Sequence, residues 1–581
     1  MKKRYIIIYE DAPPLVWKAV KKLSKYTGIE VLSKHKIGKN TLALEVYLNK
    51  NTIPNLCNEG FSIKRLGDKK ILISANSPEG LANGVYDMLR FLMSKKIFDP
   101  FKIKWDIEEK PFFRIRAIQV GYYNFNLPEL TPDTWTLENW REYIDFLRLL
   151  NANMIICLMA HDYLSDVPQT EKNKWRFEIL KKAMEYAQEV GIKFHLAYMY
   201  NFVPQALWWR LPEFRAQELP GYHGIGLCWS KAKHHILRLH ENRMRYFSNI
   251  DGYQLLYLES CGICACKECL GRFSDIIVES FEEIRKKLKE VNPRAECVFQ
   301  YWLASILPYF MPEIKNLPEE LLKKMPKNTI FLDASGNFWR KWLKRQGKNI
   351  KDFPEHLNLI YDAGYRVINY FFFMDEEAGL EASCNVLPYP HIREIMNEIK
   401  YSRENLHLEG VCGYRLAPLM QLIGDFVFFR LAFKPDLTMD ELVEEIAGLL
   451  TTEPENKEHV RKAILLLEEY WSTFDTSTLE KAAGLFEVAS KSESSKYLKY
   501  IADGVSVLLD VHRLSERELS SEEQSKAKME IYEKMKNMFI YQGYTTEHIW
   551  ESRAISFLFP RIDWWVKYIR EAKKLVAEES V

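Results

Sequence analysis

Short apolar runs alternate with amphipathic stretches along the middle of the chain. The apolar runs predict eight strands at residues 113–123, 154–161, 193–201, 253–260, 296–302, 329–335, 366–376 and 411–418. The stretches between them include segments with helical periodicity at residues 137–152, 173–191, 273–291 and 355–365. Near-continuous apolar strands that alternate with helices indicate a parallel sheet covered by helices. Eight such units predict a (β/α)8 TIM barrel over residues 109–425.

The two ends of the chain have different patterns. Strands at residues 4–10, 41–48 and 69–76 alternate with amphipathic helices at 13–28 and 77–96, which predicts a small α/β domain over residues 1–108. After residue 425 only helical patterns are found, at 437–450, 456–471, 496–514 and 522–539. We therefore expect an α/β protein with three parts, the last a helical domain over residues 426–581.

Composition argues against several classes of partner. Lys plus Arg (81) nearly balance Asp plus Glu (79), and no basic block suggests binding to nucleic acid or to an anionic membrane. The apolar run near the N-terminus is too short for a signal peptide, and no run reaches the roughly 20 residues of a membrane span. These features predict a cytoplasmic protein, and its richness in Lys, Glu, Ile and Tyr is compatible with a thermophilic source.

Polar and aromatic side chains follow the predicted barrel strands. TIM-barrel chemistry takes place at the C-terminal ends of the strands, where eight loops meet around one pocket. Four carboxylates at these ends are candidates for catalysis: Glu259, Asp333, Asp375 and Glu376. The candidate substrate-binding residues are Tyr123, Asn124, His161, Asp162, Tyr200, Asn201, Trp229, Tyr301, Trp302 and Arg415.

This combination fits the cleavage of a glycosidic bond. The reaction needs one protonated carboxylic acid for the leaving oxygen and a second carboxylate that acts as base or nucleophile. Glu259 ends an apolar strand, where partial desolvation would raise its pKa as a general acid requires. Asp333 and the Asp375/Glu376 pair are the candidates for the opposing carboxylate. Each acid could instead cap a helix or pair with an arginine, and His161 and the tryptophans could be structural.

Four cysteines follow Glu259 closely. Cys261, Cys264, Cys266 and Cys269 form a C-x2-C-x-C-x2-C pattern that could bind structural zinc or an iron–sulfur cluster, or could remain as reduced thiols. Four thiolates would fill the coordination sphere and leave no position for a catalytic water. We therefore expect no cofactor in catalysis, with structural zinc as one interpretation of the cysteines. The remaining cysteines, including Cys228, fit buried small hydrophobes.

Three segments resemble known glycoside hydrolases. ISANSPEGLANGVYDMLRFL (73–92) followed by EEKPFFRIRA (108–117) resembles the entry to the barrel in α-glucuronidases (family 67) and β-N-acetylhexosaminidases (family 20). LCWS (227–230) and the cysteine-rich loop resemble relatives of those enzymes. The resemblance implies that Glu259 is the acid and that Asp333 and Glu376, or Asp375, activate water. In hexosaminidases an Asp precedes the acid and orients the substrate's acetamido group, whereas Leu258 stands there in this chain.

The sequence therefore predicts an exo-acting, α-glucuronidase-like glycoside hydrolase for short oligosaccharides. Arg415, or lysines near the pocket, would bind a uronate carboxylate, and arginine is the better bidentate partner. A hexosaminidase-like enzyme is the first alternative, and a non-catalytic carbohydrate-binding or metal-stabilised scaffold protein is the second. The helical domain could close the site or mediate a homo-oligomer.

Overall fold

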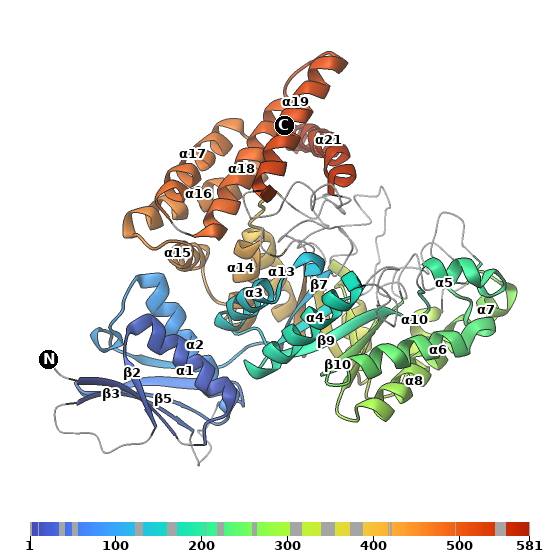
Figure 1. Cartoon of the computed structure of the whole chain (residues 1–581), viewed down its shortest axis with the longest axis horizontal. Coiled ribbons are helices and arrows are strands. Elements are labelled where there is room, and N and C mark those ends of the chain that lie inside the picture. Colours follow the sequence, from blue (N-terminus) through green and yellow to red (C-terminus); the bar gives the residue numbers. More distant parts are fainter. Residues whose placement is uncertain are drawn as a thin grey trace.

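The computed structural model describes residues 3–9, 11–33, 41–48, 56–121, 132–159, 171–203, 205–217, 226–257, 264–301, 316–337, 355–371, 387–415, 418, 421–493, 495–540 and 554–579. These residues form a mixed sheet, a closed barrel and a group of C-terminal helices (Figure 1).

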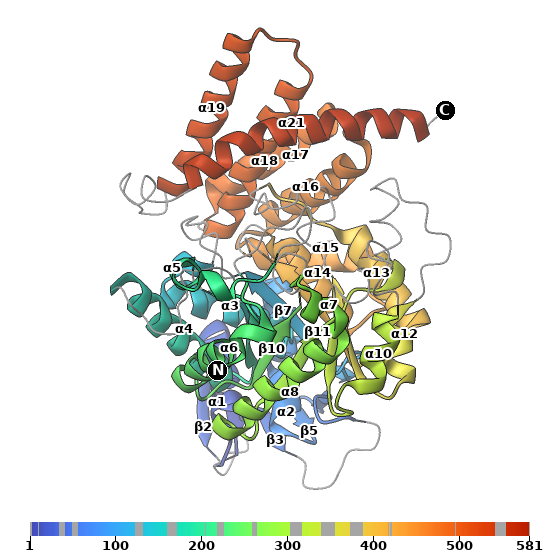
Figure 2. The same ribbon diagram turned by 90° about the vertical axis from the view of Figure 1, so that its right-hand side faces the viewer.

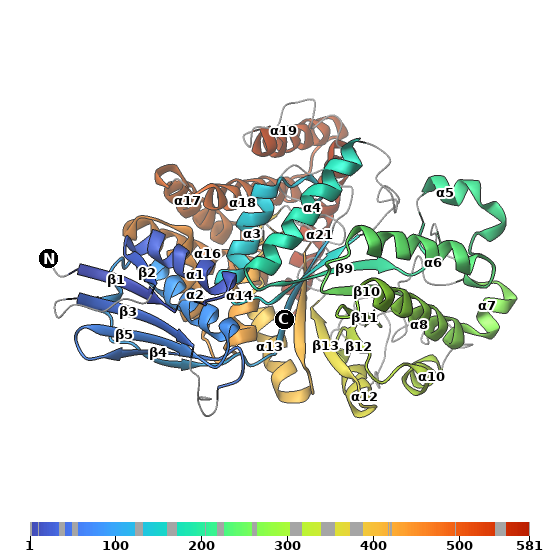
Figure 3. The ribbon, with the colours of Figure 1, turned by 60° about the horizontal axis from the view of Figure 1, so that its bottom comes forward.

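The N-terminal sheet has six strands in the order β2-β1-β3-β5-β4-β6. Its strands are β1 (Lys3–Ile8), β2 (Glu30–Ser33), β3 (Thr41–Leu48), β4 (Phe61–Leu66), β5 (Lys70–Ala75) and β6 (Asp106–Glu109). Helices α1 (Pro14–Thr27) and α2 (Pro78–Lys95) lie side by side against it (Figure 3). The sequence analysis predicted β1, β3 and β5 but not β2, β4 and β6. The antiparallel pairing of β4 with β5 and β6 makes the sheet mixed.

The barrel confirms all eight predicted strands. They are β7 (Ile115–Gly121), β8 (Met154–Leu158), β9 (Lys193–Met199), β10 (Gly252–Leu256), β11 (Glu296–Gln300), β12 (Ile330–Asp333), β13 (Arg366–Phe371) and β14 (Gly410–Arg415). Every neighbouring pair is parallel, and β14 pairs with β7 to close the ring. Their near-complete burial explains the continuous apolar runs, since one face meets the barrel interior and the other meets helices.

Ten described helices belong to the barrel units. They are α3 (Leu137–Leu149), α4 (Glu171–Glu189), α5 (Gln205–Arg210), α6 (Trp229–Tyr246), α7 (Lys267–Gly271), α8 (Phe273–Val291), α10 (Leu317–Lys324), α12 (His356–Asp362), α13 (Ile392–Asn405) and α14 (Leu422–Phe433). Every residue of α14 is buried. This helix spans the expected domain boundary at residue 425, and the backbone oxygens of its last two residues accept hydrogen bonds from the segment that leads into β7.

The C-terminal part of the chain is helical, as predicted. Its helices are α15 (Met439–Leu450), α16 (Pro454–Thr473), α17 (Thr476–Ser492), α18 (Lys496–Ser515), α19 (Ser521–Ile540) and α21 (Ala554–Glu579). Figure 2 shows α16, α17, α18, α19 and α21 above the barrel, with α14 and α15 between these helices and the barrel. Within the described residues, no helix has the length and apolarity needed to cross a lipid bilayer.

Strand register separates the residues that face the barrel interior from those that face the helices. Gln254 of β10 donates a hydrogen bond to Gln119 of β7 at 3.1 Å and another to Gln300 of β11 at 2.5 Å, so these three side chains point inward. Residues alternate between the two faces along a strand, and directly paired residues of neighbouring strands share a face. The glutamines therefore fix the orientation of every other barrel residue through the register.

Candidate functional site

The predicted site residues fall into two groups. Those within the described residues are Tyr200, Asn201, Trp229, Cys264, Cys266, Cys269, Tyr301, Asp333 and Arg415. The others lie outside the described residues: Tyr123, Asn124, His161, Asp162, Glu259, Cys261, Trp302, Asp375 and Glu376. The residues outside the description follow the C-terminal ends of the barrel strands or lie in the connections beyond them.

Tyr200, Trp229 and Tyr257 form an aromatic group beside the end of β10. The rings of Tyr200 and Tyr257 stack with centroids 4.5 Å apart, and the ring of Trp229 lies 6.3 Å from that of Tyr200. The Tyr257 hydroxyl lies 2.8 Å from Ser280 Oγ of α8. All three aromatic side chains are at most 2% exposed. The group therefore packs between the barrel and its helices in this structure.

Asn201 and Tyr301 are also buried. The side-chain amide of Asn201 donates to the backbone oxygen of Leu227 at 3.0 Å, which joins the end of β9 to the start of α6. Tyr301 follows β11 and is 1% exposed, with its ring 5.6 Å from that of Phe331 on β12. The burial raises the pKa of the Tyr301 hydroxyl well above its usual range.

Asp333 ends β12 and is 1% exposed. Its Oδ1 accepts a hydrogen bond from the backbone N–H of Ala334 at 2.9 Å. The register pairs Asp333 with Asn369 of β13, whose amide donates to Ser402 of α13 at 2.8 Å. Because paired residues share a face, the register puts Asp333 on the helix-facing side of the sheet.

Arg415, the expected cationic group, forms a buried ion pair. Its Nε donates to Oδ1 of Asp425 in α14 at 2.5 Å, and both side chains have no exposed surface. Tyr143 of α3 donates to the other oxygen of Asp425 at 2.8 Å. A Cβ at Gly424 would lie 2.4 Å from Nη2 of Arg415, so a larger residue there would displace the guanidinium. The Asp425 carboxylate thus balances the charge that was expected to bind a uronate.

The interior near the C-terminal end of the barrel contains two tyrosines absent from the predicted set. Tyr370 of β13 and Tyr414 of β14 lie on the same face as the glutamines by register, with ring centroids 5.9 Å apart. Both are 3% exposed. The period-two alternation of β13 and β14 could have identified them, because it distinguishes inward from outward residues once one inward residue is known.

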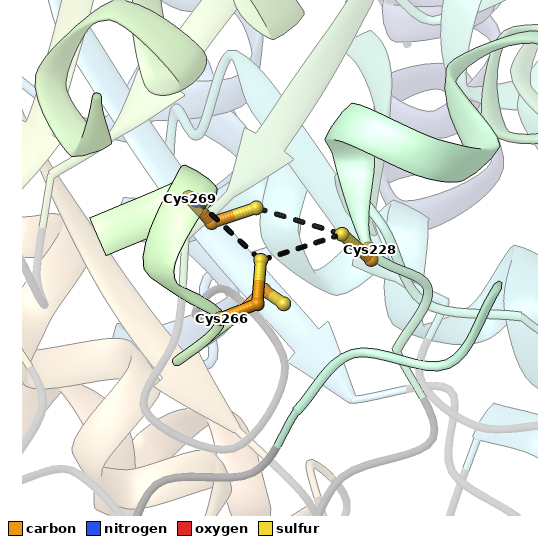
Figure 4. A group of neighbouring side chains, drawn as sticks. Cys228, Cys266 and Cys269 are labelled. Atoms are coloured by element: carbon orange, nitrogen blue, oxygen red, sulfur yellow. Dashed lines mark hydrogen bonds between the residues drawn. The ribbon is translucent and has the colours of Figure 1, made fainter. Parts of the chain in front are cut away.

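Four sulfurs converge beside the start of α6, and they differ from the predicted four. Cys228, Cys264, Cys266 and Cys269, here called the thiol cluster, have Sγ atoms that all lie within 4.8 Å of one another. Figure 4 shows Cys228 facing Cys266 and Cys269 from a separate segment of chain. Cys228 therefore joins three of the predicted cysteines, whereas Cys261 lies outside the described residues. This corrects the expectation that Cys228 is an isolated buried hydrophobe.

The thiol cluster is electrostatically unusual. Hydrogen bonds from the thiols of Cys228 and Cys269, with backbone N–H groups of Cys266 and Gln217, lower the pKa of Cys264 below its usual range against the opposing effect of burial. All described cysteines, including those of the cluster, are free of disulfide bonds.

The connection after β13 contacts the C-terminal helices. The rings of Tyr389 and Trp471 of α16 stack with centroids 4.5 Å apart, and Trp471 Nε1 donates to the backbone oxygen of Pro388 at 3.2 Å. Glu468 of α16 accepts hydrogen bonds from the backbone N–H groups of Ile392 and Arg393 at 3.1 and 2.9 Å. The helical region is thus attached to the segment that follows residues 372–386, where the Asp375/Glu376 pair lies.

The protein also contains a cavity of 560 Å³. Its lining comes mainly from helices α1, α2, α3 and α15 and includes Tyr26, Tyr86, Met93 and Phe146. Its lining is mostly apolar and contains none of the predicted site residues.

Comparison with known proteins gives no sequence match but clear structural matches. No protein-family model matches the chain, and no curated protein matches it. A GH138 enzyme targeting pectin rhamnogalacturonan II matches with a TM-score of 0.60 and 12% identity, over 98% of this chain and 74% of the enzyme. A family GH115 4-O-methyl-α-glucuronidase with specificity for decorated arabinogalactans has a TM-score of 0.61 and 12% identity, over 93% and 77% of the two chains.

A third match is the Flavobacterium johnsoniae chitobiase, with a TM-score of 0.50 and 13% identity over 92% of this chain and 95% of that enzyme. The matches extend well beyond the barrel, because each covers more than nine tenths of the chain. The chain therefore has a fold found in glycoside hydrolases of several families.

Proposed function

We propose that this protein is a glycoside hydrolase with Glu259 as its general acid. One observation carries the proposal: the fourth strand of a barrel shared with several glycoside hydrolase families, β10, ends at Leu256, three positions before Glu259. C-terminal strand ends are where catalytic groups of these barrels are found. Glu259 would protonate the leaving oxygen while an opposing carboxylate activates water or attacks the anomeric carbon.

The Asp375/Glu376 pair is our choice for the opposing carboxylate. The contacts of Asp333 argue against that role, since its register neighbour Asn369 bonds to α13 and Asp333 itself accepts from Ala334. Asp375 and Glu376 follow β13, three strands around the ring from β10.

An α-linked uronide is the substrate class that we propose first. The structural match to a 4-O-methyl-α-glucuronidase supports this choice. Leu258 precedes Glu259, so the chain lacks the Asp that the resemblance to hexosaminidases would require at that position. Because Arg415 is neutralised by Asp425, a cation from another position would have to bind the uronate carboxylate.

The test is hydrolysis of a panel of chromogenic glycosides by wild type and by Glu259→Gln. The panel contains uronides, N-acetylhexosaminides and neutral hexosides in both anomers. Glu319→Gln is the matched control, because Glu319 lies on α10 with a side chain that is 78% exposed. We expect turnover of uronides that falls about a thousandfold in Glu259→Gln and is unchanged in the control. Equal turnover in all three proteins would reject Glu259 as the acid.

Absence of turnover on the whole panel, with sugars still bound in calorimetry, would favour a carbohydrate-binding protein instead. Turnover of N-acetylhexosaminides alone would keep the enzyme class and replace the uronide as substrate.

A further inference from the structure

The thiol cluster draws its members from two segments of chain. Cys228 is the N-cap residue of α6, and the others lie at and beside the short helix α7. Cys228, Cys264 and Cys269 are at most 3% exposed, and Cys266 is partly buried. Cys228 faces Cys266 and Cys269 from the other segment (Figure 4), and because all four sulfurs lie within 4.8 Å of one another they form a compact group rather than a row.

The spacing of the sulfurs fits a tetrahedral metal ion. Zinc binds thiolates at about 2.3 Å, so two sulfurs on a regular tetrahedron lie about 3.8 Å apart. Cys228 Sγ lies 3.5 Å from Cys269 Sγ and 3.9 Å from Cys266 Sγ. A disulfide would require a separation of about 2.05 Å. These separations fit four ligands of one ion and are too long for disulfide bonds.

Three hydrogen-bond donors lie close to the sulfurs, as is usual for cysteines that bind a metal. The backbone N–H of Gln217 donates to Cys264 Sγ at 3.3 Å, and that of Cys269 donates to Cys266 Sγ at 3.4 Å. Ser230 Oγ lies 3.4 Å from Cys269 Sγ. Donors of this kind stabilise the negative charge of ligating sulfurs and fix their orientation.

We propose that Cys228, Cys264, Cys266 and Cys269 bind one Zn²⁺ ion. Four thiolates complete the tetrahedral coordination, so the ion has a structural role. It connects the segment between β9 and α6 to the segment that follows β10. The backbone already joins these segments once, since the N–H of Ala265 donates to the oxygen of Gln217 at 2.8 Å.

The ion also has a consequence for the acid, and this step rests on the proposed function. Residues 258–263, which include Glu259, lie between Tyr257 at the end of β10 and Cys264. Tyr257 is held by its stack on Tyr200 and by Ser280, and the ion would hold Cys264. Both ends of the segment that carries the acid would then be fixed, which makes the zinc ligands positioning residues for Glu259.

The experiment measures the metal content of the purified full-length chain by elemental mass spectrometry. Wild type is expected to contain about one zinc per chain, in line with a complete four-thiolate site. Three substitutions are compared: Cys228→Ser, Cys261→Ser and Cys412→Ser. Cys412 is the matched control for a buried thiol, because it also has no exposed surface but lies in β14.

Only Cys228→Ser is expected to lose its zinc. Loss of zinc in Cys261→Ser with retention in Cys228→Ser would restore the ligand set predicted from sequence and overturn the one proposed here. If Cys228→Ser fails to fold, Co²⁺ exchange into wild type decides, since tetrahedral four-thiolate cobalt has strong visible absorption. No such absorption and no bound zinc would overturn the proposal.

Two further outcomes also count against it. Iron at one atom per chain would overturn the choice of metal, and thiol titration of the denatured chain showing disulfides would overturn metal binding. None of these readouts uses turnover. Zinc without hydrolysis of any glycoside would therefore reject the proposed function and leave the metal site standing.

Discussion

The connection after β10 continues into a cluster of four thiols, whereas the connection after β13 continues into residues that pack against helix α16. The first attachment is local, because Cys228 and Cys264 belong to neighbouring units of the barrel. The second is distant, because Trp471 and Glu468 come from the helical region. Both connections contain candidate carboxylates. The two connections that carry the proposed catalytic carboxylates are thus attached by different groups, so each attachment can be disrupted separately.

The largest expected effect comes from the carboxylates after β13. Glu376→Gln and Asp375→Asn are each compared with Asp333→Asn in uronide hydrolysis. We expect one substitution of the pair to lower kcat about a hundredfold to ten-thousandfold, since it removes the group that activates water. Thermal unfolding of Asp333→Asn separates a structural effect from a catalytic one. A collapse of kcat in Asp333→Asn alone, with an unchanged melting temperature, would move the base to β12.

The next largest effect is expected from Trp471, whose ring packs against the segment after β13. Trp471 is 7% exposed, and Trp471→Ala removes both its stack on Tyr389 and its hydrogen bond to Pro388. Truncating a buried tryptophan costs about 3–5 kcal/mol of unfolding free energy. Trp209→Ala is the control, because that side chain is 61% exposed. Chemical denaturation gives the difference, and zinc content should stay at the wild-type value. Equal stability of the two variants would show that α16 does not hold this connection.

We expect the stability of the folded chain to depend on pH through a buried histidine near β10. His240 of α6 donates from Nε2 to the backbone oxygen of Tyr200 and accepts at Nδ1 from the Tyr253 hydroxyl, both at 2.7 Å. Burial, with a smaller effect of Arg243, lowers the pKa of His240 from 6.5 to about 3. Below pH 6.5 the unfolded chain therefore binds a proton that the folded chain does not, and stability falls as the pH is lowered.

The loss due to His240 alone is about 2 kcal/mol between pH 7 and pH 5. Chemical denaturation of wild type and of His240→Gln at both pH values measures it, since glutamine does not titrate in this range. Zinc is quantified in the same samples, because acid also protonates thiolates. A wild-type curve parallel to that of His240→Gln would contradict the assignment.

The smallest expected effect concerns Glu468. Its carboxylate accepts from two backbone N–H groups at the start of α13, where the N-cap residue His391 makes no side-chain cap. Glu468→Gln keeps one acceptor oxygen and loses the charge, which should cost about 1 kcal/mol. The neighbouring Glu469→Gln is the control, because Glu469 is exposed on the same helix. Hydrogen exchange at Ile392 and Arg393 should increase only in the first variant.

The sequence allowed the barrel strands to be found because each is a compact apolar run, and a run of that kind depends only on neighbouring residues. Strands β2, β4 and β6 were missed because they are short or carry polar residues on an exposed face, as β6 does. Pairing across the N-terminal sheet stabilises them, and such pairing cannot be read from one segment.

The site was predicted less completely for a related reason. Cys228 lies thirty-six positions before Cys264, so spacing rules that search for nearby pairs do not connect them. The helix-facing orientation of Asp333 and Arg415 follows from strand pairing with β13 and β7, and the ion pair of Arg415 with α14 is a further long-range contact. The sequence alone does not show these contacts. The strand-end rule selects residues at one end of the barrel, but it does not tell which side of the strand each residue faces.

The pairing of the first barrel strand with the last also affects how the protein folds during its synthesis. Ile115 of β7 pairs with Gly410 of β14, and the N–H of Phe113 donates to the oxygen of Ala432. A nascent chain therefore keeps one edge of β7 open until almost three quarters of the protein has left the ribosome. The unpaired backbone N–H and C=O groups of an open strand edge can form hydrogen bonds with strands of other chains. Slow translation or premature termination before residue 410 would thus produce aggregates, and binding of a chaperone during synthesis would be most useful over this interval.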